Sequence, residues 1–221
     1  MRFENTEVYG VKRALHGMRN PLESWSRSDT TEGADGISIG KNDLGLAMRL
    51  IRSGSEHRKF MRQIMVSVDI TAPLYWWKEF DTYKVGTVAN STSTMHKLAS
   101  TPITADCFEI DDYEDGLDYD GVILGDKINE HIAFLEQMRV KYLETKDKRY
   151  WKELIRWLPS SWLQTRTVTM TYENLLAMCS RGQRRFHKLT EWSAAFIDWA
   201  RSLPYAQELL FIDELDENGE N

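Results

Sequence analysis

The spacing of apolar positions predicts several helices and two strands. Between residues 42 and 54, apolar side chains recur every three or four positions: Leu44, Ala47, Met48 and Ile51. This spacing is typical of an amphipathic helix, with Asn42 or Asp43 placed to cap its N-terminus and Gly54 to end it. From Phe60 to Ile70 the apolar residues alternate instead, interrupted only by Arg62, which predicts a strand with one buried face.

Residues 73–80, "PLYWWKEF", place three aromatic side chains in a row. We expect a helix that Thr71 caps and that tolerates Pro73 in its first turn. A helix that is apolar on nearly every side is usually buried, so the core interpretation accounts for Trp76 and Trp77. A binding site lined by their rings is the alternative.

The remaining pattern predicts further helices and one more strand. Helices are expected over residues 122–147, 150–158, 172–179 and 184–202, and the β-branched, alternating run "LQTRTVTMT" predicts a strand over 163–171. Residues 82–106 are expected to be irregular, and 111–121 to form a solvated acidic loop that lacks the ligand spacing of a calcium loop. The fold class is therefore α+β. One domain is expected over residues 1–221, with an irregular N-terminal segment (1–40) and a frayed acidic tail (213–221).

Composition narrows the functional classes. The chain has 221 residues, 42% of them hydrophobic, and a net charge of -6, which argues against nucleic-acid backbone as the main partner. Its two cysteines form neither a disulfide framework nor a zinc site, and we expect no metal. No signal-peptide pattern and no run of 18 apolar residues occurs, so we expect a cytoplasmic protein without a membrane partner.

One basic cluster, "SRGQRRFHK", suggests an anion site. Arg181, Arg184 and Arg185 lie beside the expected start of a helix, where backbone N–H groups and guanidinium forks favour a phosphate. The alternative is a solvated helix entry whose charge is balanced by the acidic tail. Motifs for a serine hydrolase, a Rossmann site and a P-loop are all absent from the sequence.

Several segments, taken in order from about residue 42 to 200, resemble the flavin-dependent thymidylate synthases, also called thymidylate synthase complementing proteins. They are Glu56-His57 before an alternating strand, "IRWLPSSWLQTRTVT", and the helix beginning near "RRFHKLTEW". The resemblance implies a small antiparallel sheet flanked by long helices. It also implies FAD shared between the subunits of a homotetramer, and methylation of dUMP to dTMP. NADPH and methylenetetrahydrofolate would be needed only if the protein is active.

The chain departs from this family at its RHR signature. Counted without gaps from Glu56-His57, RHR falls on Trp76, Trp77 and Lys78, so Lys78 is the only cation there. The signature serine falls on Asp81, and the arginine that grips the nucleotide falls on Gln183, next to Arg181 and Arg184. The tryptophan side chain carries no positive charge and cannot donate two parallel hydrogen bonds to a phosphate, as arginine does.

The resemblance therefore leaves two hypotheses. In the first, the chain binds FAD and a pyrimidine deoxynucleotide. The substrate-phosphate residues would then be Lys78, Arg166, Arg181, Arg184 and Arg185, and the cofactor-binding residues would be His57, Trp76, Trp77, Asp81, Asn90, Ser91 and His187. In the second, the chain is a catalytically inactive homologue that serves as a binding or assembly scaffold, with tryptophans filling the vacated pocket.

Overall fold

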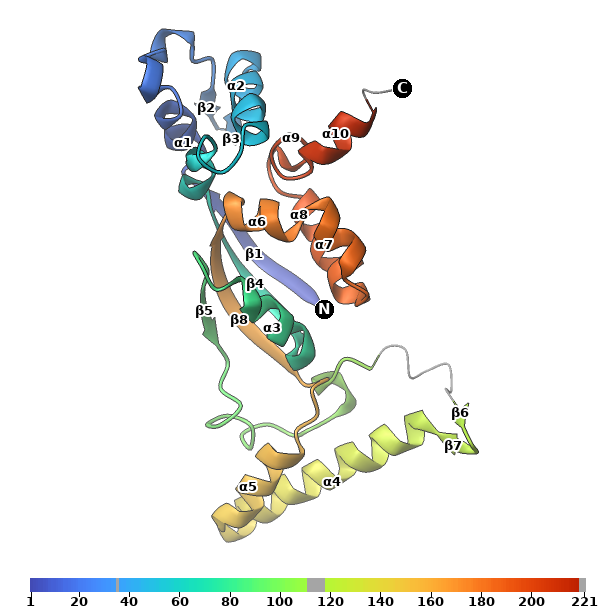
Figure 1. Ribbon diagram of the computed structural model, residues 1–221. Coiled ribbons are helices and arrows are strands. Elements are labelled where there is room, and N and C mark those ends of the chain that lie inside the picture. Colours follow the sequence, from blue (N-terminus) through green and yellow to red (C-terminus); the bar gives the residue numbers. More distant parts are fainter. Residues whose placement is uncertain (35, 111–117, 219–221) are drawn as a thin grey trace. The chain divides into compact units, whose positions relative to one another are not determined.

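The protein divides into two compact units. A computed structural model describes residues 1–34, 36–110 and 118–218 (Figure 1). Unit 1 consists of Met1–Arg2, Ile70–Glu79 and Asn90–Arg166. Unit 2 consists of Phe3–Asp69, Phe80–Ala89 and Thr167–Asn221. The expectation of a single domain stays a prediction.

A four-stranded sheet has the strand order β1-β4-β8-β5. Its strands are β1 (Arg2–Tyr9), β4 (Met65–Pro73), β8 (Leu163–Thr171) and β5 (Val88–Ser91). The strands β4 and β8 are adjacent in the middle of this order and carry the most buried side chains, whereas β1 and β5 are edges. Two short antiparallel pairs, β2 (Thr31–Gly33) with β3 (Gly36–Ser38) and β6 (Asp118–Tyr119) with β7 (Val122–Ile123), complete the β structure. The α+β class with a small antiparallel sheet is confirmed.

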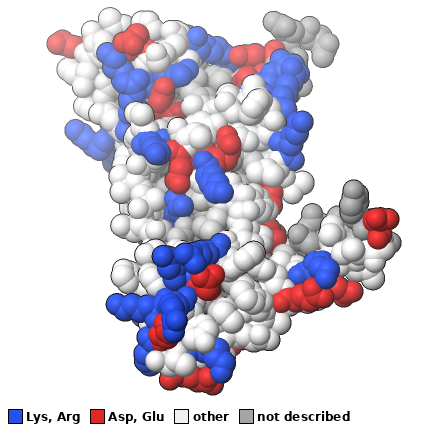
Figure 2. All heavy atoms as spheres, turned by 60° about the horizontal axis from the view of Figure 1, so that its bottom comes forward, with Lys and Arg blue, Asp and Glu red and all other residues white. Residues whose placement is uncertain are grey.

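Unit 1 contains most of α3 (Leu74–Phe80) and the helical pair α4 (Leu124–Thr145) and α5 (Lys148–Trp157). Apolar side chains from these two helices and the preceding loop form one core cluster: Leu98, Ala99, Ile103, Phe108, Ile132, Leu135 and Leu154. The outer face of α5 is basic, and Figure 2 shows Lys and Arg side chains gathered over it. The predicted helices at 122–147 and 150–158 are thus confirmed.

Unit 2 contains the remaining helices. They are α1 (Val11–Gly17), α2 (Lys41–Arg52), α6 (Tyr172–Met178), α7 (Arg181–Phe186), α8 (Ile197–Arg201), α9 (Ala206–Leu209) and α10 (Ile212–Asn218). A π-helix, Glu191–Phe196, leads into α8. Phe3 of β1 stacks on Trp199 with ring centroids 4.9 Å apart, and Trp192 contacts Phe196 at 4.9 Å. This aromatic packing ties the first strand to a helix near the other end of the sequence.

Several local predictions were wrong. The segment 1–40 is not irregular, because it forms β1 and α1; β1 is a polar edge strand, so it lacks the alternation of a buried one. The predicted strand from residue 60 begins only at Met65, since Lys59–Gln63 forms a 3-10 helix. Thr71 belongs to β4 and does not cap α3.

The C-terminal third also differs from the prediction. The helix expected over 184–202 is interrupted after Phe186, because His187 is extended and ends α7. Residues 213–218 of the acidic tail, which was expected to be frayed, belong to α10, and residues 219–221 lie outside the described residues. Most of the predicted acidic loop, residues 111–117, lies outside the described residues. The segment 82–106, expected to be irregular, contains β5.

Candidate functional site

A cleft of about 1180 Å³ opens in unit 2. Three segments line it: residues 17–27, from the last residue of α1 onward; one face of α2; and residues 56–63, which precede β4. Its charged and polar lining residues include Arg19, Glu23, Arg27, Asn42, Arg49, Glu56, His57 and Lys59. The volume and this mixture of charged and apolar walls suit a large organic ligand.

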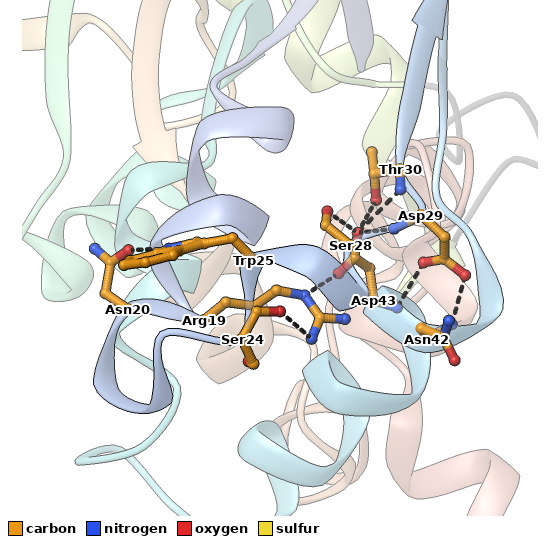
Figure 3. A network of polar contacts seen from close by, with 9 residues as sticks. All are labelled: Arg19, Asn20, Ser24, Trp25, Ser28, Asp29, Thr30, Asn42 and Asp43. Carbon is orange, nitrogen blue, oxygen red and sulfur yellow. Dashed lines mark hydrogen bonds and ion pairs between the residues drawn. The ribbon is translucent and has the colours of Figure 1, made fainter.

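The cleft is shaped by a buried ion pair (Figure 3). Arg19, only 4% exposed, donates from Nε to Asp43 Oδ1 at 2.5 Å, and Asp43 is fully buried. The second carboxylate oxygen of Asp43 accepts hydrogen bonds from Ser28 Oγ (2.8 Å), Thr30 Oγ1 (2.6 Å) and the backbone N–H of Thr30 (3.0 Å). The network joins the loop 19–30 to α2, and so fixes the loop that carries Arg27.

Burial by itself would raise the pKa of the Asp43 carboxyl. Hydrogen bonds from Thr30, Ser28 and Arg19, and the attraction of the Arg19 charge, outweigh burial and lower the pKa below its usual value. Asp43 is therefore a carboxylate at neutral pH. It does not cap α2, contrary to the sequence prediction, because its side chain faces Arg19 and the loop.

The N-terminus of α2 is capped by a residue from the loop. Asp29 Oδ2 accepts from the backbone N–H of Asn42, and Asp29 Oδ1 from that of Asp43, both at 2.9 Å. The close approach explains Gly40, since a Cβ there would lie 2.6 Å from the Asp29 backbone oxygen. Two carboxylates, Asp29 and Asp43, thus attach the loop to one helix.

The rim of the cleft carries three basic side chains. Within the described part of the chain, Arg27, Arg49 and Lys59 make no hydrogen bond or ion pair through their side chains. His57, the predicted cofactor-binding residue, lines the same cleft. By contrast Arg58, one residue further on, points to Glu173 and donates to both of its carboxylate oxygens at 3.1 Å.

A second polar arrangement lies in unit 1, around the start of β8. The Trp77 indole N–H donates to the backbone oxygen of Gln164 at 2.9 Å. The Arg166 guanidinium lies 4.2 Å above the Trp77 ring, and its Nε donates to Gln164 Oε1 at 3.0 Å. Gln164 Nε2 in turn donates to the backbone oxygen of Thr92 at 2.8 Å. A cation–π contact and a hydrogen bond therefore hold Arg166 in one orientation.

The other residues predicted around "PLYWWKEF" take different places. Trp76 and Trp77 are 0% and 1% exposed and meet edge to face, as the core interpretation expected. Stacking of either ring on a ligand would require this packing to open. Lys78 is exposed on α3, and Asn90 and Ser91 are exposed on β5. The assignment of these residues to a ligand stays a prediction.

In the basic cluster "SRGQRRFHK", the Arg184 side chain is paired with the acidic tail. Arg184 Nη2 lies 3.2 Å from Asp213 Oδ2 and 3.2 Å from Glu214 Oε1, and the backbone N–H of Arg181 donates to Asp213 at 2.9 Å. The balancing of this cluster by the tail was the alternative that the sequence left open. A phosphate at Arg184 would have to displace these carboxylates.

The remaining predicted residues of unit 2 differ in how far they are buried. His187 is buried and stacks on Trp192 with centroids 4.1 Å apart. Arg185 is exposed, and Asp81 is half-buried after α3. Sequence reasoning missed Arg19, Arg27, Arg49 and Lys59, because isolated basic residues in loops and on a helix face carry no motif.

Comparisons with known proteins identify the fold. No protein-family model and no curated protein matches the sequence. The structure is similar to that of the flavin-dependent thymidylate synthase ThyX from Helicobacter pylori complexed with FAD and dUMP. The TM-score is 0.66 at 17% identity, and the match covers 96% of this chain and 99% of that chain.

Two further solved structures agree. A second Helicobacter pylori ThyX structure with FAD and dUMP gives a TM-score of 0.64 at 17% identity, covering 94% of this chain and 95% of that chain. The structure of the UMP/dUMP methylase PolB from Streptomyces cacaoi, bound with 5-Br dUMP, gives a TM-score of 0.62 at 14% identity. This match covers 96% of this chain and 93% of that chain. The chain therefore has the fold of the flavin-dependent thymidylate synthases, which confirms the fold that the resemblance implied. Within the described residues, no helix is long and apolar enough to cross a membrane.

Proposed function

We propose that this protein binds FAD and a pyrimidine deoxynucleotide, and that it methylates dUMP if it is active. The observation that carries the proposal is the similarity of the fold over 96% of the chain to a protein complexed with both ligands. PolB, a UMP/dUMP methylase of the same fold, supports a pyrimidine nucleotide as the substrate class. Bound FAD would supply the hydride chemistry, and the chain itself would supply binding and orientation.

The residues present fit such a cofactor. The unit 2 cleft has the volume for a dinucleotide, and His57 lies in its wall. Its rim carries three cations that have no side-chain partner among the described residues. These features suit an anionic ligand with a large organic body. His57 is accordingly the residue that we assign to the cofactor.

Arg166 is the residue that we assign to the nucleotide phosphate. Its guanidinium is already oriented by Trp77 and Gln164, so binding an anion would cost little side-chain entropy. Lys78, which is exposed on α3, is a second cation for the same role. Arg181, Arg184 and Arg185 remain secondary candidates, because Arg184 is paired with Asp213 and Glu214.

A homotetramer in the cytoplasm, with FAD shared between subunits, is part of the same proposal. NADPH and methylenetetrahydrofolate belong to it only for an active enzyme. A catalytically inactive scaffold is the second candidate, and the buried tryptophan pair favours it. The ungapped count places RHR on Trp76, Trp77 and Lys78, where two indoles fill the interior.

The first test is an absorption spectrum of the purified protein before and after loading with FAD and desalting. A retained flavin band supports the proposal, whereas a protein that never retains FAD refutes the cofactor assignment. Titration of dUMP then tests Arg166→Gln against Arg156→Gln, an exposed change on α5 in the same unit. We expect a loss of about tenfold or more in dUMP affinity for Arg166→Gln only, as for one charge-assisted hydrogen bond.

A further inference from the structure

The turn between α4 and α5 gathers positive charge in a chain whose net charge is negative. The segment 141–152 contains five basic and two acidic side chains, which gives it a net charge of +3, whereas the whole chain carries -6. We call its basic residues the basic tip: Lys141, Lys146, Lys148, Arg149 and Lys152. All five are exposed, and Figure 2 shows Lys and Arg side chains gathered over α5.

The protein neutralises the charge of the basic tip only in part. Lys141 Nζ lies 3.3 Å from a carboxylate oxygen of Glu144, and Arg149 Nη2 lies 2.6 Å from one of Asp147. Within the described residues, the other three members make no hydrogen bond or ion pair through their side chains: Lys146, Lys148 and Lys152. Three ammonium groups therefore remain available to an anion from outside the chain.

The placement of these charges does not favour an isolated helix. Lys148 and Arg149 occupy the first turn of α5, where the positive end of the helix dipole disfavours cations. The N-cap carboxylate of Asp147 pairs with Arg149 and leaves Lys148 uncompensated. Lys148 and Lys152 are four residues apart, so their like charges are neighbours on the helix surface. Positive charges in such positions on an exposed surface indicate a negatively charged partner.

The geometry of the basic tip suits a partner with regularly spaced charges. Lys148 and Lys152 are separated by about 6 Å along the axis of α5 and by about 40° around it, because a helix rises 1.5 Å and turns 100° per residue. The packing of Leu154 into the unit 1 core holds this face of α5 outward. The major groove of a DNA duplex admits a helix, and duplex phosphates place about one charge on every 1.7 Å of axis. Several lysines of the tip can therefore contact phosphates at once.

Other anionic partners fit the basic tip less well. Insertion into a membrane surface needs an exposed apolar helix face, and the apolar face of α5 is packed in the core. Single strands are usually held by exposed aromatic rings, whereas the aromatic residues of this segment are half-buried: Tyr142, Tyr150 and Trp151. A small anion is bound in a concave site, and the surface of a helix is convex.

We propose that the basic tip docks the phosphate backbone of duplex DNA without reading its base sequence. Lys146, Lys148 and Lys152 contact phosphates as point charges, and such contacts carry no sequence information. The net charge of -6 argues against DNA as the main partner of the chain, so this binding is weak and depends strongly on salt. None of these lysines is assigned to FAD or dUMP, so DNA binding and flavin retention can be tested separately.

Fluorescence anisotropy of a labelled, mixed-sequence duplex measures this binding with the full chain over about 20–200 mM salt. The test variant is Lys148→Gln/Lys152→Gln. The matched control, Lys12→Gln/Arg13→Gln, removes the same charge from two exposed positions of α1. Glutamine is a good helix former and all four side chains are exposed, so both variants are expected to fold, which circular dichroism checks.

We expect the wild type to bind the duplex and the test variant to show a salt dependence shallower by about 2 on a log–log plot, as for two lost phosphate contacts. Affinity at low salt should fall about tenfold or more in the test variant and less than about threefold in the control. Equal losses in the two variants, or no binding by the wild type at low salt, overturn the proposal.

Two competitors test the kind of partner. A single strand of the same length and an oligoglutamate of matched charge should each displace the labelled duplex about tenfold less well than unlabelled duplex does. Equal competition by the single strand would overturn the preference for a duplex, and equal competition by the oligoglutamate would assign the tip to acidic protein segments instead. Flavin retention by a wild type that does not bind DNA would refute this surface and leave the proposed function standing.

Discussion

The Asp43→Asn substitution tests whether the buried ion pair with Arg19 holds the cleft together. Asp43 is fully buried and accepts five hydrogen bonds, from Arg19 Nε, Ser28 Oγ, the Asp29 backbone N–H, and both the backbone N–H and the hydroxyl of Thr30. An asparagine amide removes the negative charge and turns one acceptor oxygen into a donor that faces other donors. The Arg19 charge then remains buried without compensation.

The expected loss follows from this uncompensated charge. Breaking a buried pair by neutralising one partner typically costs about 3–5 kcal/mol, and we expect a loss of unfolding free energy in this range. That is a large share of the roughly 5–15 kcal/mol that stabilises an ordinary domain. The substitution should therefore lower the urea midpoint strongly, as followed by far-ultraviolet circular dichroism.

The double variant Arg19→Met/Asp43→Asn is the control that separates the ion pair from general disruption, because the asparagine oxygen still accepts from Ser28 and Thr30. Removing both charges leaves no buried ion without a partner, so we expect the double variant to be less destabilised than Asp43→Asn alone. A loss below about 1 kcal/mol for Asp43→Asn would refute the reasoning. So would a double variant whose loss equals the sum of the losses measured for Arg19→Met alone and Asp43→Asn alone.

The dependence of this loss on pH provides a second check. The folded-state pKa of Asp43 is lowered, so its contribution to stability is complete above its unfolded-state pKa of about 3.9 and is lost as the pH falls through the folded value. The difference in unfolding free energy between wild type and Asp43→Asn should be constant near neutrality and shrink below about pH 4. A difference that grew on acidification would contradict the assigned direction of the shift.

Three further outcomes are expected. Leu135→Ala removes a fully buried side chain from the unit 1 core and should cost about 2–5 kcal/mol in urea unfolding, and a loss under 1 kcal/mol would show that this site repacks. Trp77→Phe leaves the buried backbone oxygen of Gln164 without its indole donor and should cost about 1–3 kcal/mol, whereas an unchanged thermal midpoint would contradict this role. Burial raises the pKa of the Cys179 thiol to about 12. The native protein should therefore react with a thiol reagent at pH 8 only at Cys107. Rapid labelling of both thiols would show that the interior around Cys179 opens.

The sequence by itself was enough to predict those helices and strands that bury one face and expose the other. The apolar stripe of α4 and the apolar–polar alternation of β8 can be detected in the sequence because each element buries one face and exposes the other to solvent. Both elements were predicted close to their observed bounds. The burial of Trp76 and Trp77 was also predictable, since α3 is apolar on nearly every side. The thymidylate synthase-like fold was predicted from a family resemblance, carried in order by Glu56-His57, "IRWLPSSWLQTRTVT" and "RRFHKLTEW".

Only the tertiary structure decided the composition of the cleft. The sequence predicted Asp43 as a candidate N-cap of α2. In the structure the Asp29 side chain from the loop caps this helix, and Asp43 pairs with Arg19. Arg49 and Arg52 are both basic residues near the end of α2, yet only Arg49 lines the cleft. Local patterns report which side of an element is apolar, whereas the partner of a charge depends on contacts between residues far apart in the chain. Such contacts leave no periodic signal in a single sequence.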